Sequence, residues 1–222
     1  MFYYRGLGIV VVASLFVAAF ITYAVVLVLA LLSAVAAASP HPENLRLRQI
    51  GVAEGLPSNR VNALLQDPAG YLWIGTGDGL ARYDGMRMKV WRHDPGRAGS
   101  LGDNFIQAVH VDARDRVWVA TEKGGLARYV RDGDRFEPLD DGGLISDPNI
   151  LSLTDRDGEL WFGAMDGALY RWSDSAGLTR FAPDDDAPDG LTSQPILDLD
   201  VDPQGRVWAA TFGGLAVADG DG

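Results

Sequence analysis

The chain is 222 residues long, and acidic residues outnumber basic ones by 30 to 19, which gives a formal net charge of −11. Nucleic-acid binding normally requires clustered Lys and Arg that neutralise phosphates, so this charge balance argues against a nucleic-acid partner. The chain contains no cysteine, which excludes disulfides, thiolate catalysis and cysteine-ligated metals within it.

The N-terminal part, residues 1–38, is predicted to be a signal peptide or a membrane anchor helix. After Arg5, the run Gly6–Ala38 is uncharged and mostly apolar. About 20 apolar residues in a helix cross a bilayer, so the run is long enough for an uncleaved anchor. The small residues before Ser39-Pro40 are instead typical of a secretory signal that is removed. Either alternative directs the rest of the chain out of the cytoplasm, and an uncleaved helix would also make the membrane a partner.

Residues 39–54 are predicted to be a linker that contains one strand. Two prolines open the segment, and Leu45–Ile50 then alternates apolar and polar side chains. Such alternation is typical of a half-buried strand. This strand is a candidate for closing the region that follows it.

Four copies of one pattern fill residues 55–222. Each copy has a tryptophan with a leucine and an aspartate before it and a glycine after it, at the same distances in all four. The copies recur about every 45 residues, which is the length of a four-stranded β-propeller blade. The four sets are Leu56, Asp67, Trp73 and Gly79; Leu101, Asp112, Trp118 and Gly124; Leu144, Asp155, Trp161 and Gly167; and Leu191, Asp202, Trp208 and Gly214.

The pattern predicts an all-β fold: a β-propeller with about four four-stranded blades, preceded by one N-terminal apolar helix. The last copy ends before a fourth strand, so Leu45–Ile50 could complete its sheet and close a four-bladed ring. The alternative, which the sequence favours, is an arc of a larger propeller. The blades are expected at about 55–99, 100–142, 143–189 and 190–222, and the strands of the first at Val61–Gln66, Tyr71–Thr76, Leu80–Tyr83 and Met86–His93.

The repeated tryptophans and aspartates are expected to be structural. Each tryptophan has apolar neighbours and a ring large enough to fill the space between two sheets, with carbohydrate stacking as the weaker alternative. Each aspartate opens a turn, where its side chain can accept hydrogen bonds from backbone amides. The predicted anchors are Trp73, Trp118, Trp161 and Trp208, and the predicted turn formers are Asp67, Asp112, Asp155 and Asp202.

No metal, cofactor or catalytic residue is predicted. Asp198–Asp202 begins like a calcium-binding loop, but Pro203 stands where that loop needs glycine and Ala209 where it needs a bidentate glutamate. His93 and His110 lie in different copies, without a catalytic motif around either. A propeller enzyme, a lyase or a glycosidase acting on polysaccharide, is an alternative that needs an acid and a base from two blades.

A polar segment before the first strand of each copy is the predicted ligand-binding surface. If the first strands line a central channel, these segments surround one mouth of it, and convergent polar side chains on a rigid scaffold are typical of binding sites. The alternative is that they only satisfy backbone groups of their own turns. The candidates are Ser58, Asn59, Arg60, Asp103, Asn104, Ser146, Asp147, Ser193 and Gln194.

The copies resemble the two-component regulator propeller repeat. That pattern runs Gly-Leu-Pro, a strand ending in Asp-x-x-Gly, then Leu-Trp-Ile-Gly-Thr and a strand similar to Gly-Leu-x-Arg-Tyr. The other copies depart from it, with Asp115 in the second turn, Ala164 for threonine in the third copy and Ala209-Ala210 in the fourth. The first copy matches nearly throughout, at Gly55–Pro57, Asp67–Gly70, Leu72–Thr76 and Gly79–Tyr83.

The resemblance implies an extracytoplasmic, ligand-sensing module of a bacterial receptor. Such repeats usually form the sensor part of receptors whose output domain is a histidine kinase, which acts through a phosphorelay, or a diguanylate cyclase. We therefore expect a periplasmic propeller, anchored to the inner membrane if the helix is retained, that binds a small molecule or an oligosaccharide and is not itself an enzyme. The chain would be the N-terminal part of such a sensor, a fragment without the output domain. A plain interaction scaffold and a homodimer are open alternatives.

Overall fold

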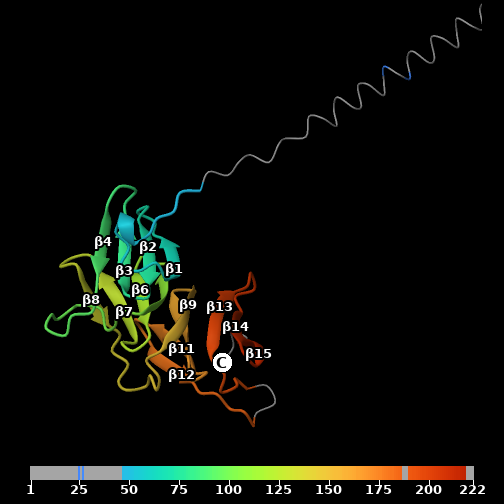
Figure 1. Ribbon diagram of the computed structural model, residues 1–222. Helices are drawn as coiled ribbons and strands as arrows, with labels where there is room; N and C mark the ends of the chain where they lie inside the picture. The colour runs from blue at the N-terminus through green and yellow to red at the C-terminus, as the bar shows by residue number, and fades with distance from the viewer. Residues whose placement is uncertain (1–24, 26, 28–46, 187–189, 219–222) are drawn as a thin grey trace, which may run out of the picture. The chain divides into compact units, whose positions relative to one another are not determined.

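Figure 1 shows the computed structural model, which describes residues 47–186 and 190–218 together with Val25 and Leu27. The chain divides into two compact units, Met1–Arg48 and Gln49–Gly222, and the second carries the strands. The predicted N-terminal helix lies outside the described residues, apart from Val25 and Leu27, which are helical. Within the described ranges, we find no helix with the length and apolar character needed to cross a bilayer.

Strands in the described residues form four antiparallel sheets, each built from consecutive strands, and these sheets are the blades of the propeller. Blade 1 contains β1 (Val61–Gln66), β2 (Leu72–Thr76), β3 (Gly79–Tyr83) and β4 (Met88–Trp91). Blade 2 contains β5 (Ile106–Val111), β6 (Val117–Thr121), β7 (Leu126–Val130) and β8 (Arg135–Pro138). Blade 3 contains β9 (Ile150–Arg156), β10 (Glu159–Ala164), β11 (Leu169–Ser173) and β12 (Gly177–Phe181), and blade 4 contains β13 (Ile196–Val201), β14 (Val207–Thr211) and β15 (Gly214–Ala218). The all-β prediction is confirmed.

The turn between the first two strands follows from the sequence in three blades. In blade 1, Asp67 Oδ1 accepts a hydrogen bond from the Tyr71 amide at 2.9 Å, and the Gly70 amide donates to the Asp67 carbonyl at 2.8 Å. Gly70 has φ of 88°, a left-handed conformation that glycine adopts without strain. Asp112 and Asp202 accept amide bonds in the same way in blades 2 and 4, which confirms the predicted turn role for these three residues.

The first strand of each sheet lies on the inner side of the fan of blades. β1 packs along β5, β5 along β9 and β9 along β13. In the described residues β1 does not pack along β13 in this way, so the blades form an arc. The predicted closing strand Leu45–Ile50 is not formed over its described part, Leu47–Ile50, which has no strand structure. Leu47 is 84% exposed, because the alternating side chains have no sheet to cover.

Large side chains fill the interfaces between neighbouring blades. Trp73 of blade 1 is fully buried, and its ring meets Tyr129 of blade 2 edge-on with the ring centres 5.0 Å apart. Edge-to-face pairs of this kind contribute about 0.5–1.5 kcal/mol beyond the burial of their surface. Trp118 and Trp161 are buried too, which confirms their predicted core role, whereas Trp208 is only half-buried on the side of blade 4 that faces away from blade 3.

One glycine of the repeat is required by the close approach of two blades. A β-carbon at Gly75 in β2 would lie 2.7 Å from Cγ2 of Ile106, at the start of β5. Gly163 of β10 stands in the same relation to Ile196 at the start of β13. Because they have no side chain, Gly75 and Gly163 allow their strands to pack closely against the first strand of the next blade.

Candidate ligand-binding site

The predicted polar segments lie at the end of the blades where each first strand begins. In blade 1, Ser58 Oγ accepts a hydrogen bond from the Arg60 amide at 3.1 Å. Asn59 Oδ1 accepts one from the Val52 amide at 3.0 Å. The Arg60 guanidinium lies 4.5 Å from the centre of the Phe105 ring in the next blade. These three side chains hold loops in place.

In blade 2, Asn104 connects two blades. Its Oδ1 accepts a hydrogen bond from the His93 amide at 2.7 Å, and its carbonyl accepts one from the Gly79 amide at 2.8 Å. Asp103 has a buried Oδ2 for which the described residues offer no partner. Asn104 therefore has a structural role. The Asp103 carboxylate keeps one oxygen atom, Oδ2, free of hydrogen bonds from the described residues.

Ser146 of blade 3 is the centre of a small polar cluster. Its Oγ donates to Asp166 Oδ2 at 2.5 Å and accepts from Arg180 Nη2 at 3.2 Å. Asp147 Oδ1 accepts a hydrogen bond from the Asn149 amide at 2.9 Å, which fixes the start of β9. This cluster is partly exposed, and it leaves the buried Arg180 Nε without a hydrogen-bond partner among the described residues.

In blade 4, the Ser193 amide donates to Asp185 Oδ1 at 2.8 Å, and the Gln194 backbone lies against Gly167 of blade 3. The nine predicted residues thus share one end of the blades, and most of them bond to loops. None of the nine lines the groove described below.

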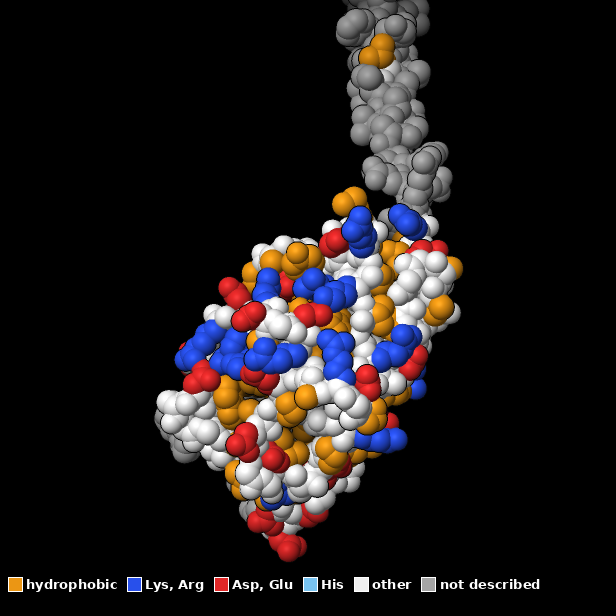
Figure 2. Space-filling model, turned by 90° about the vertical axis from the view of Figure 1, so that its left-hand side faces the viewer, with side chains coloured by type: hydrophobic (Ala, Val, Ile, Leu, Met, Phe, Trp, Pro, Cys, Tyr) orange, Lys and Arg blue, Asp and Glu red, His pale blue; other side chains and the backbone are white. Residues whose placement is uncertain are grey.

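The face shown in Figure 2 carries many basic side chains, but acidic ones are mixed among them. Lys89 Nζ is 2.7 Å from Asp134 Oδ2 across the interface between blades 1 and 2. Glu137 is bound by two arginines of blade 2, Arg128 at 2.8 Å and Arg135 at 2.7 Å. This face does not present the unbroken positive surface that would suit a phosphate backbone.

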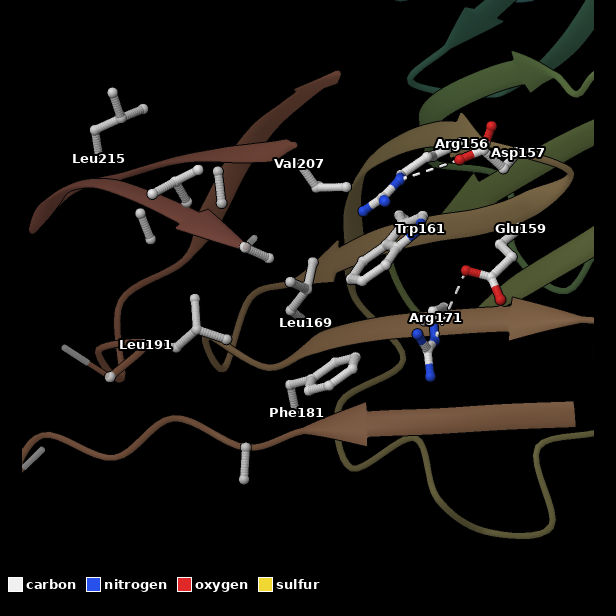
Figure 3. Close-up of a pocket in the computed structure, with 16 residues that line it drawn as sticks. Arg156, Asp157, Glu159, Trp161, Leu169, Arg171, Phe181, Leu191, Val207 and Leu215 are labelled. Atoms are coloured by element: carbon white, nitrogen blue, oxygen red, sulfur yellow. Dashed lines mark hydrogen bonds and ion pairs between the residues drawn. The ribbon is translucent and has the colours of Figure 1, made fainter. Parts of the chain in front are cut away.

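A groove of about 770 Å³ lies between blades 3 and 4 (Figure 3). Its volume falls within the roughly 300–1,000 Å³ that is typical of small-molecule sites. Strands β10, β11 and β12 form one wall, and β14 and β15 form the other. The lining side chains include Trp161, Leu169, Arg171 and Phe181 on the first wall and Val207, Ala209, Ala216 and Ala218 on the second.

The groove is open because blade 4 presents small side chains where blades 2 and 3 present aromatic ones. Tyr129 of β7 packs on Trp73 between blades 1 and 2, and Trp172 of β11 packs on Trp118 between blades 2 and 3, both at 5.0 Å between ring centres. The corresponding residue of β15 is Ala218. In the described residues β15 is also the last strand of its sheet, whereas blades 2 and 3 have a fourth strand.

The groove contains a buried hydrogen-bond donor without a partner. Trp161 is only 4% exposed, and its indole Nε1 has no acceptor among the residues that the structure describes. An unpaired buried donor costs about 1–3 kcal/mol. The three equivalent indoles each donate to a carboxylate: Trp73 to Asp67 at 3.0 Å, Trp118 to Asp112 at 2.8 Å and Trp208 to Asp202 at 2.9 Å.

The difference arises in the first turn of blade 3. Arg156 pairs directly with Glu159, so the turn consists of Asp157 and Gly158 alone. These two residues have φ of 52° and 82°, which is typical of a two-residue hairpin. The other blades have a longer turn, so the pairing of β9 with β10 is shifted by one residue relative to theirs.

Asp155 is therefore not a turn former, contrary to the prediction. A shift of one residue moves a side chain to the opposite face of the sheet. Asp155 lies opposite Leu160 and points toward blade 2, where its Oδ1 is 2.8 Å from Nε2 of His110. The sequence signal that could have shown this is Asp157-Gly158, since Asp-Gly strongly favours a two-residue hairpin. The unpaired Trp161 indole follows directly from it.

In blades 2 and 4, the surroundings of the indole favour a charged carboxylate. Burial by itself would raise the pKa of Asp112, but hydrogen bonds from Trp118 Nε1 and from Arg116 outweigh burial and hold that pKa below its usual range. In blade 4, burial likewise favours a higher pKa for Asp202. Hydrogen bonds from Trp208 and Arg206 outweigh burial and lower that pKa. An indole N–H beside a guanidinium is therefore a good environment for a carboxylate.

Two arginines and two acids lie along the groove (Figure 3). Arg156 Nε is 3.4 Å from Asp157 Oδ2, and the Asp157 side chain is 83% exposed. Arg171 Nε is 3.9 Å from Glu159 Oε2, and its guanidinium lies 5.7 Å from the centre of the Trp161 ring. The contact of Arg156 is to a mostly exposed carboxylate, and exposed pairs contribute only about 0–1 kcal/mol, so Arg156 remains able to bind an added anion.

Chemically, the groove offers hydrogen-bond donors and cations between apolar walls. In the described part of the chain, no three His, Asp or Glu side chains are arranged to hold a metal ion. Asp198 and Asp200 of the sequence that resembled a calcium loop accept bonds from the amides of the next residues. The arrangement suits the binding of an organic anion.

Comparisons with known proteins agree with this fold. A family model described as "Two component regulator propeller" matches residues 55–78 and 100–123. Histidine kinase P4 of Formosa agariphila is 40% identical over 48 residues, which cover 22% of this chain and 4% of that protein.

Solved structures extend the similarity over most of the blades. The extracellular domain of a putative hybrid two-component system from B. thetaiotaomicron is 25% identical with a TM-score of 0.60, and the match covers 73% of this chain and 21% of that one. Virginiamycin B lyase from Staphylococcus aureus shares the fold alone, with 12% identity, a TM-score of 0.53, and coverage of 72% of this chain and 54% of the lyase. The chain therefore spans only a small part of the two-component proteins that it matches.

The first two copies are matched by the family model, most of the chain superposes on part of the extracellular domain of a putative hybrid two-component system, and the first copy carries the pattern almost complete. The chain thus carries two-component regulator propeller repeats at residues 55–78 and 100–123, and its propeller is related to the extracellular domains of hybrid two-component systems.

Proposed function

We propose that the propeller is the ligand-sensing module of a two-component-type receptor and that it works outside the cytoplasm. The similarity to the extracellular domain of a hybrid two-component system supports this role. The apolar run Gly6–Ala38, which is suited to export or anchoring, supports the location. In this role the chain binds a small molecule or an oligosaccharide and passes a change of shape to its receptor, without catalysing a reaction.

The observation that carries the proposal is the groove between blades 3 and 4. The other two blade interfaces are filled by aromatic side chains, whereas this one has space for a ligand and is lined by Trp161, whose buried indole N–H has no partner among the described residues. A ligand that fills the space would contact both walls and so fix the distance between the two blades. Binding would then favour one arrangement of the blades, which is how a ligand shifts a conformational equilibrium.

Filling the groove tests the proposal. Tyrosine in place of Ala218 restores the residue type that blade 2 has at this position. The full chain is screened by thermal shift against sugars, oligosaccharides and organic acids, because a ligand of the folded state raises Tm. We expect a compound that stabilises the native chain and loses at least about tenfold in affinity, roughly 1.4 kcal/mol, with A218Y.

The matched control is Leu197→Tyr, which adds a similar side chain at a half-exposed position of β13 outside the groove. This variant should bind as the native chain does. A ligand that stabilises the native chain and A218Y equally binds elsewhere and would move the site away from the groove. A flat response to every compound would contradict the sensing role itself.

A further inference from the structure

We propose that the groove between blades 3 and 4 binds a small organic carboxylate, whose charged group occupies the position that the chain's own aspartate takes in the other blades. The ligand class is a single carboxylate joined to an apolar body. The inference deepens the proposed function and rests on it.

Three blades of this chain already contain the arrangement that a bound carboxylate would complete in blade 3. In blades 1, 2 and 4, one aspartate oxygen accepts a hydrogen bond from the indole N–H of the repeat tryptophan and lies close to an arginine. The arginine approaches Asp67 from the next blade in the first case and from the same turn in the others. The pairs are Arg131 with Asp67 at 3.2 Å, Arg116 with Asp112 at 2.6 Å and Arg206 with Asp202 at 2.7 Å.

Blade 3 keeps the indole donor and lacks the acceptor; Glu159 stands where blades 2 and 4 have Arg116 and Arg206, so the cation of this site is Arg156. The Trp161 indole is buried and unpaired, and Asp155 is held on the opposite face by His110. An external carboxylate therefore has no competing group from the repeat's own aspartate. Figure 3 shows the Trp161 indole and the Arg156 side chain at the same end of the groove, and both line it.

Arg156 lies at the boundary between the two blades. A β-carbon at Gly205, in the first turn of blade 4, would come 3.5 Å from Arg156 Nε. The guanidinium thus lies where the first turns of blades 3 and 4 meet, on the same blade as Trp161, whereas Arg131 reaches Asp67 from the following blade. Its contact with Asp157 is long and on an exposed side chain, so its other nitrogens can take a carboxylate.

The rest of the groove defines the body of the ligand. Leu169, Phe181 and Val207 supply apolar walls, which suit an aliphatic or aromatic group. Asp157 and Glu159 at the rim carry negative charge and would repel a second anionic group. The groove should therefore prefer a monocarboxylate with an apolar body over a dicarboxylate or a neutral analogue.

The test uses the full chain, purified in detergent and labelled with ¹⁵N at tryptophan. All six tryptophans lie between residues 73 and 208, so each indole N–H can be followed separately, and Trp161→Phe assigns its signal by loss. The probes are phenylacetate and its neutral analogue phenylacetamide, which differ in the charged group alone. We expect phenylacetate to move the Trp161 signal saturably, phenylacetamide to bind at least about tenfold more weakly, and the Trp73 and Trp118 signals to stay in place.

Arg156→Gln should reduce the preference for phenylacetate over phenylacetamide about tenfold, whereas Arg114→Gln, which removes an arginine bound to Asp174 instead, should leave it unchanged. Equal binding of both probes at the Trp161 signal would overturn the carboxylate site and leave a sensing groove. No effect of phenylacetate, while another compound stabilises the native chain, would overturn it in the same way. If no compound of any kind bound the chain, the proposed function would fail as well.

Discussion

At the scale of single residues, the role of the repeat tryptophan depends on whether its indole N–H is bound to the aspartate of its own blade. A repeat tryptophan with its aspartate completes the core and the turn together, because the carboxylate joins the indole to the backbone amides of the turn. Asp112 is 5% exposed and accepts bonds from Trp118, Arg116 and the amide of Arg114. The tryptophan without its aspartate, Trp161, keeps the burial and leaves a donor for another molecule.

Replacing Asp112 by asparagine should destabilise the fold by about 2 kcal/mol, because charge-assisted bonds to a buried carboxylate are lost. The folded-state pKa of Asp112 is lowered, so its contribution is present above the pKa of the unfolded chain, about 4, and is lost as the pH falls through the folded-state value. The variant should therefore lose less stability than the native chain between pH 4 and pH 2. Urea denaturation over that pH range measures both effects.

The control lies in the same turn. Asp115 has φ of 60°, a conformation that asparagine also accepts, and its side chain is exposed. Asp115→Asn should change the free energy of unfolding by less than about 0.5 kcal/mol. Equal losses for the two variants would show that the charge in this turn, and not the buried bonds, is what stabilises it.

At the scale of strands and turns, the sequence specifies the blades well and the groove poorly. Hydrophobic alternation and turn residues predict strands such as β1 and β13 at their observed bounds, because they depend on neighbours along the chain. Counting back from Trp161 places Asp155 with the other aspartates. The two-residue turn of Asp157 and Gly158 instead puts the Asp155 side chain on the opposite face of the sheet. The groove depends on which side chain of β15 faces blade 3, and no local pattern contains that information.

The two-residue turn can be tested through Gly158. Its φ is 82°, and a β-carbon there would meet no atom within 4 Å, so the cost of alanine is that of the backbone conformation alone. We expect Gly158→Ala to destabilise the fold by about 1–2 kcal/mol. Gly96→Ala, at an exposed glycine without positive φ, should change stability by less than about 0.5 kcal/mol in the same urea titration. A small effect at Gly158 would argue against the observed turn and thereby against the register shift.

At the scale of the whole molecule, the described parts of the blades make one arc in which the strands of each blade pack against those of the neighbouring blades. The N-terminal apolar run and the related extracellular domain together favour a position outside the cytoplasm. The absence of cysteine from the chain makes this position easy to test, because any thiol that is introduced is unique.

A cysteine at Met86, whose side chain is 87% exposed, should react with a membrane-impermeant maleimide in intact cells that make the full chain. Ala81→Cys is the matched control, since Ala81 of the same blade is fully buried and should react only after unfolding. Labelling of the Met86 position only after the cells are broken would contradict the extracytoplasmic location.

The open groove affects the order in which the blades separate during unfolding. Ion pairs such as Lys89 with Asp134 and Arg116 with Asp174 tie blades 1, 2 and 3 together, whereas no ion pair crosses from blade 3 to blade 4 in the part of the chain that the structure describes. In a stack of nearest-neighbour units, the least cohesive junction separates first. Amide hydrogens of β14 and β15 should consequently exchange with deuterium before those of β6 and β10, and a compound seated in the groove should slow that exchange more than any other.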